Sequence, residues 1–129
     1  MRLLLRITAI LELGAGLGLL TIPSIVASLM LGAPLDAPAA LTVARIGGAA
    51  LLALAIACWL ASYDAQSCAA RGLVSAMVIY NIGAALVLGM AGIRSQSAGV
   101  ALWAAVILHS GMTLYCMTQL LKKELRKLN

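Results

Sequence analysis

Four long apolar runs, separated by short polar connections, organise this chain of 129 residues. They cover residues 3–22, 39–61, 72–90 and 99–121. Each run has close to the roughly 20 residues that a helix needs to cross the hydrocarbon core of a bilayer. A segment in lipid must satisfy its own backbone hydrogen bonds, so each run is predicted to be a membrane-spanning helix.

The connection over residues 23–38 contains a shorter apolar segment. Pro23 suits the first position of a helix, where its missing N–H would have no partner in any case. Four apolar residues then follow at the spacing of one helix face: Ile25, Val26, Leu29 and Met30. They predict a short helix at the membrane interface, ended by Gly32, Pro34 and Pro38. The alternative is a kinked extension of the first span.

The predicted fold is therefore all-α: a polytopic membrane four-helix bundle, with the short interfacial helix between spans one and two. Residues 1–129 form a single four-transmembrane-helix domain with a basic tail, residues 122–129. In the tail, Leu121, Leu125 and Leu128 keep a helical stripe among basic residues. We expect the tail to continue the fourth helix along the membrane surface; a helix that docks a partner is the alternative.

Composition supports a membrane protein and excludes several other classes. Apolar residues make up 64% of the chain and charged residues 10%, against about 25% charged in soluble domains. These values exclude a soluble globular domain, a disordered chain and a disulfide-rich scaffold. Cys58, Cys68 and Cys116 form no CxxC pair and there is one His, so no metal or cofactor is expected and the thiols are predicted to be free and buried.

The basic residues predict an orientation rather than a nucleic-acid partner, because they lie at the ends of the apolar runs. One side would carry seven of them: Arg2, Arg6, Arg71, Lys122, Lys123, Arg126 and Lys127. The other side has only Arg94, with Arg45 just inside the second span. By the positive-inside rule, both termini are predicted to be cytoplasmic.

Small residues predict close helix packing. Gly14 and Gly18 form a GxxxG in the first span, and alanines recur every four residues in the second: Ala49, Ala53, Ala57 and Ala61. Small residues let helices approach closely in lipid. The pattern leaves open whether the contact is within one chain or between chains, so a homodimer or a larger membrane complex is a possible assembly, in addition to contact with membrane lipids.

Each span contains one strongly polar residue: Glu12, Arg45, Asn81 and His109. Glu12, Asn81 and His109 lie nine or ten residues into their spans, about 14 Å deep at 1.5 Å per residue. Arg45 lies about 9 Å deep, and its long side chain can extend toward Glu12. Since polar groups inside a membrane usually face the bundle interior, we expect these groups to converge there, with Tyr80 beside them.

Two interpretations of this cluster are open. In the structural one, a Glu12–Arg45 ion pair and hydrogen bonds from Asn81 and His109 fix the helix register. In the functional one, they form a midplane site that binds a lipid, a quinone or another amphipathic molecule, or relays protons. Glu12 would carry a proton or hold Arg45, and Arg45 would hold an anionic head group.

His109, whose ordinary pKa is about 6.5, would titrate near neutral pH, and Asn81 would both donate and accept hydrogen bonds. No nucleophile–base pair accompanies these groups, so no catalytic residue and no enzymatic activity is expected.

Two groups of residues make the chain resemble the small four-span bacterial membrane proteins called DoxX-like. One is the first span with Glu12, Gly14 and Pro23, and the other is Arg45 followed by Gly47 and Gly48. The resemblance covers most of the chain. It implies a location in the bacterial inner membrane and, for some members, a role as an accessory subunit of quinone-linked oxidoreductases. It assigns no catalytic residue.

The chain also resembles the small multidrug-resistance transporters, which are four-span dimers that use a glutamate in the first span for proton–drug exchange. Glu12 matches that glutamate, while Arg45 and the few aromatic residues depart from the pattern. We expect a direct Glu12–Arg45 pair if the protein binds a ligand or has an accessory role, and a Glu12 that faces a cavity without Arg45 if it is a proton-coupled exporter.

Overall fold

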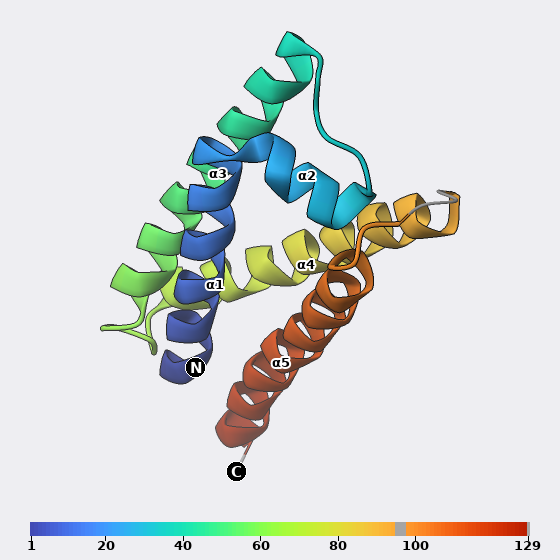
Figure 1. Ribbon diagram of the computed structural model, residues 1–129. Coiled ribbons are helices and arrows are strands. Elements are labelled where there is room, and N and C mark those ends of the chain that lie inside the picture. Colours follow the sequence, from blue (N-terminus) through green and yellow to red (C-terminus); the bar gives the residue numbers. More distant parts are fainter. Residues whose placement is uncertain (95–97, 129) are drawn as a thin grey trace.

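The computed structural model describes residues 1–94 and 98–128, and the fold within them is all-α. The five helices are α1 (Arg2–Thr21), α2 (Pro23–Leu31), α3 (Pro38–Ala61), α4 (Cys68–Arg94) and α5 (Leu102–Leu128) (Figure 1). Among them α1, α3, α4 and α5 (as far as Lys122) are long and apolar enough to cross a membrane. The chain is therefore a multi-pass membrane protein, as the hydrophobic pattern predicts.

The short helix between the first two spans is confirmed as a separate element. At Ile22 the backbone leaves the helical region (φ −131°, ψ 51°), so α2 is not an extension of α1. Pro23 lies in the first turn of α2, as predicted. Gly32 ends the helix with φ 78°, a conformation that favours glycine, and its N–H donates to the carbonyl of Ser28 at 3.0 Å.

The two last spans differ in their limits from the hydropathy prediction. Helix α4 begins at Cys68 rather than at residue 72, because the hydroxyl of Ser67 accepts a hydrogen bond from the N–H of Ala70 and caps the first turn. Helix α5 begins at Leu102 rather than at residue 99. The preceding N–H groups of Gly99 and Ala101 instead donate to the last carbonyls of α2.

Helix α5 continues without a break to Leu128, as predicted for the tail. The tail side chains of Lys123, Arg126 and Lys127 lie outside the described residues.

The long helices associate as two pairs, α1 with α3 and α4 with α5. Gly16 and Gly48 lie at a close backbone approach in the first pair: a Cβ on Gly48 would lie 2.8 Å from the carbonyl oxygen of Gly16. The predicted packing at Gly14 and Gly18 is wrong in detail. A Cβ on Gly14 would meet nothing within 4 Å, and Gly18 faces Val26 of α2.

The alanine stripe of α3 does not make this contact either. Ala49, Ala53 and Ala57 are exposed, and only Ala61 packs against the core. The helix turns the opposite face, with Gly48 and Ala55, toward the interior. Packing of the stripe against a second chain stays a prediction.

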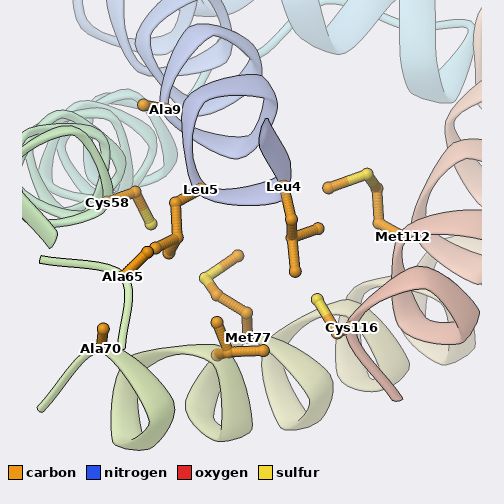
Figure 2. Packing of buried hydrophobic residues seen from close by; sticks show 10 residues of the cluster. Leu4, Leu5, Ala9, Cys58, Ala65, Ala70, Met77, Met112 and Cys116 are labelled. Atoms are coloured by element: carbon orange, nitrogen blue, oxygen red, sulfur yellow. The ribbon is translucent and has the colours of Figure 1, made fainter. Parts of the chain in front are cut away.

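The two pairs meet at the end of the molecule where α1 begins and α5 ends, which we call the termini end (Figure 1). Figure 2 shows apolar side chains from α1, α3, α4 and α5 converging there, among them Leu4, Leu5, Met77 and Cys116. At the opposite end, the α2 end, the short helix α2 contacts α1, α3 and α5. The molecule is thus closed by an apolar core at one end and bridged by α2 at the other.

The three cysteines differ in burial according to whether they lie in the apolar core. Cys58 and Cys116 are free and buried in the core, as predicted, but the prediction that Cys68 is buried is wrong. Cys68 is exposed because it opens the first turn of α4, outside the core.

The α1–α3 contact leads to a stability prediction. In Gly48→Ala the new methyl group would lie 2.7 Å from the Leu20 backbone nitrogen, and backbone atoms cannot move aside easily. We expect a loss of about 1–3 kcal/mol in the free energy of unfolding, measured in mixed detergent micelles. Gly47→Ala is the matched control, because its Cβ meets nothing within 4 Å. Equal stability of the two variants would contradict this packing.

Candidate functional site

Three of the four predicted polar residues come together just beyond the apolar core. Each lies about one helical turn from a buried residue on its own helix: Glu12 follows Ala9, Asn81 follows Met77, and His109 precedes Met112. The core therefore turns these side chains inward. Tyr80, next to Asn81, belongs to the same cluster, as expected.

Glu12 is the buried acid of the cluster, with a residue exposure of 5%. The hydroxyl of Tyr80 donates a hydrogen bond to Oε2 of Glu12 at 3.2 Å. This bond links α1 to α4. The second carboxyl oxygen, Oε1, has no hydrogen-bond partner among the described residues.

Asn81 and His109 form the second polar contact, between α4 and α5. Nδ2 of Asn81 donates to the backbone carbonyl of Met77 at 2.8 Å, and its Oδ1 lies 2.8 Å from Nδ1 of His109. The edge of the Tyr80 ring faces the His109 imidazole, with ring centroids 5.7 Å apart at 80°. The two polar contacts are thus joined into one cluster.

Arg45 does not belong to this cluster. It is exposed on α3, and the described residues contain no ion pair between it and Glu12. The reason is the helix register. Gly48 is opposite Gly16, so Arg45 lies nearer the α2 end and Glu12 nearer the termini end, a difference of seven residues of rise or about 10 Å. The ion pair that was expected of a ligand-binding or accessory protein is therefore not formed among the described residues.

A cleft begins at the polar cluster and extends toward α2. A space of about 140 Å³ is lined by Glu12, Tyr80, Asn81 and His109 together with apolar side chains. A larger space of about 510 Å³ adjoins it, since both share Ala15, Met30, Tyr80, Ala105 and His109 as wall residues. The larger space is lined by residues of all five helices and is almost entirely apolar. We call the two together the cleft.

The structure adds two wall residues that the sequence analysis did not select. Thr8 is buried, lies one turn before Glu12, and lines the polar end of the cleft. The four-residue spacing from Glu12 could have indicated it. Met30 reaches the cleft from α2, which no spacing in the sequence indicates.

The donor set of the cluster does not suit a metal ion. Within residues 1–94 and 98–128, no three His, Cys, Asp or Glu side chains are grouped in a way that could hold one. The polar groups that line the cleft are a carboxyl, an imidazole, a side-chain amide and two hydroxyls, which suits hydrogen bonding to an organic molecule.

Comparisons of the chain with protein families, with curated proteins and with solved structures find no match. The resemblances to DoxX-like proteins and to small multidrug-resistance transporters therefore stay predictions. Any functional argument depends on the geometry of the cleft itself.

Proposed function

We propose that this protein is a non-enzymatic membrane protein that binds a lipid, a quinone or another amphipathic molecule in the cleft. The observation that carries this proposal is that an apolar space of about 510 Å³ leads to a smaller space lined by five polar side chains. Ligand sites typically combine a mostly apolar wall of this size with a few polar groups that orient the ligand. The head group of the molecule would lie at Glu12, Tyr80 and His109, and its apolar body would extend toward α2.

The unused hydrogen-bonding positions favour ligand binding over a purely structural role. In a cluster that only fixed helix register, the polar atoms would all form hydrogen bonds between helices. Here Glu12 and His109 both line the cleft, and Oε1 of Glu12 and one ring nitrogen of His109 have no hydrogen-bond partner among the described residues. Polar groups are costly inside a membrane, so groups left available there mark a functional site.

The predicted orientation of the protein in the membrane indicates from which leaflet the ligand would enter the cleft. With both termini in the cytoplasm, the α2 end would lie in the outer half of the bilayer of a bacterial inner membrane. The apolar part of the cleft would then receive its ligand from the outer leaflet. Service as an accessory subunit, as the DoxX-like resemblance implies, is compatible with the same binding.

The proposal is tested by blocking the cleft. Gly14 lines its apolar part, and a side chain there would meet no neighbouring atom at Cβ. We expect native mass spectrometry of gently extracted protein to show a retained small molecule, and Gly14→Leu to lose it. Gly83→Leu is the matched control, because Gly83 is on α4, outside the cleft, and equally free at Cβ. No retained molecule in the parent protein, or the same molecule in Gly14→Leu, would contradict the proposal.

A proton-coupled exporter is the second candidate, and one specific observation favours it. Glu12 faces the cleft without Arg45, which is the arrangement expected of an exchanger. A buried carboxylate needs a cation or a proton to compensate its charge, and exchange of the two is the basis of such transport. The cleft has only one aromatic residue besides His109, Tyr80, to contact a cationic drug, which ranks this candidate second.

Transport of a cationic dye into proteoliposomes under a pH gradient separates the two candidates. An exporter is expected to move the dye, to lose at least most of this activity in Glu12→Gln, and to keep it in Arg45→Gln, which alters a residue outside the cluster. The ligand-binding proposal expects no dye transport in any of the three proteins. Transport that is indifferent to Glu12→Gln would exclude the exchange mechanism.

A further inference from the structure

We infer that the head group of the bound molecule carries a hydrogen-bond donor, a hydroxyl or a protonated amine, rather than only a carbonyl or ether oxygen. This inference rests on the proposed function, because it names the chemistry of the ligand in the same cleft. It follows from which hydrogens of the polar cluster are already used and which lone pairs remain.

Asn81 determines the tautomer of His109. The carbonyl of Met77 can only accept a hydrogen bond, so the Asn81 atom that contacts it at 2.8 Å is the amide nitrogen. The atom of Asn81 that faces His109 is therefore the amide oxygen, which accepts. The hydrogen of this contact must be on Nδ1 of His109.

A neutral imidazole carries one hydrogen, so Nε2 of His109 is left with a lone pair. His109 lines both parts of the cleft, and no described residue donates to its Nε2. The histidine therefore presents an acceptor to the ligand. Asn81 acts as a positioning residue, since it fixes this tautomer without being aimed at the ligand itself.

The remaining groups add acceptors and one hydroxyl. Tyr80 uses its single hydrogen on Oε2 of Glu12. Oε1 of Glu12 is an acceptor while the carboxyl is ionised and a hydroxyl donor once it is protonated. Thr8, whose hydroxyl has no hydrogen-bond partner among the described residues, can both donate and accept. Nε2 of His109 is thus a group at this end of the cleft that can only accept, whether Glu12 is ionised or protonated.

Ligand head groups differ in how many of these donors and acceptors of the cleft they can pair with. A hydroxyl can donate to Nε2 of His109 or to Glu12 and accept from Thr8, and an ammonium can donate to several acceptors. A bare carbonyl or ether can only accept from Thr8, and it would leave Nε2 of His109 without a donor. Sites with unpaired polar groups discriminate strongly against a ligand that lacks the matching atom.

Nitrogen NMR of the protein in detergent tests this directly, because His109 is the only histidine and gives a single pair of ring signals. We expect a protonated Nδ1 and an unprotonated Nε2 in the free protein. The probes are dodecanol, dodecylamine and methyl dodecyl ether, which share an apolar chain. The alcohol, the amine or both should shift the Nε2 signal saturably and bind about tenfold more tightly than the ether, the factor for one hydrogen bond of about 1.4 kcal/mol.

The variant Asn81→Leu removes the group that fixes the tautomer. We expect the hydrogen to be free to move to Nε2 and the preference for alcohol over ether to fall, an effect that loss of packing alone would not produce. An ether that binds as tightly as the alcohol, or an Nε2 that is protonated in the free parent protein, would overturn the inference alone. Failure of all three probes to bind would overturn the proposed function and the inference together.

Discussion

The hydrogen bond from Tyr80 to Glu12 joins the two helix pairs deep inside the membrane-spanning region, and a second one, from the Met1 amino group to Oε1 of Gln119, joins them at the termini end. Below the Tyr80–Glu12 bond, toward the termini end, the apolar core closes the bundle. Above it, α1 and α3 separate from α4 and α5, and α2 bridges them (Figure 1). The cluster therefore lies at the point where the molecule changes from a packed core to a cleft. A carboxyl at this level keeps the boundary polar between an apolar core and an almost entirely apolar space.

The contact between Gly16 and Gly48 has a consequence beyond stability. By setting the register of α1 against α3, it places Arg45 toward the α2 end and on an exposed face. An Arg45 at the level of Glu12 would have formed an ion pair and filled the polar end of the cleft. Because Arg45 lies elsewhere, no basic side chain among the described residues pairs with the carboxyl. Close packing of one helix pair thus decides the chemistry of the space beside it.

Much of the fold was predictable from sequence, because membrane insertion depends on the order of apolar and polar residues along the chain. The four spans, Pro23 at the start of α2 and Gly32 at its end all follow from local composition and backbone preference. The polar residues Glu12, Asn81 and His109 were predicted to meet, since each is costly anywhere but the interior. What the sequence could not give was the rotation and register of each helix. Arg45 and Gly14 do not make the expected contacts within the chain for that reason, because rotation depends on packing against neighbours that hydropathy does not describe.

The central claim is that Glu12 is held by Tyr80 and not by Arg45, and double-mutant cycles measure it most directly. The free energy of unfolding would be determined in mixed micelles for Glu12→Gln, Tyr80→Phe, Arg45→Gln and the two double variants that contain Glu12→Gln. We expect a coupling of about 0.6–1.7 kcal/mol between Glu12 and Tyr80. Between Glu12 and Arg45 the effects should add within about 0.5 kcal/mol. Strong coupling of Glu12 to Arg45, or none to Tyr80, would contradict this arrangement of the site.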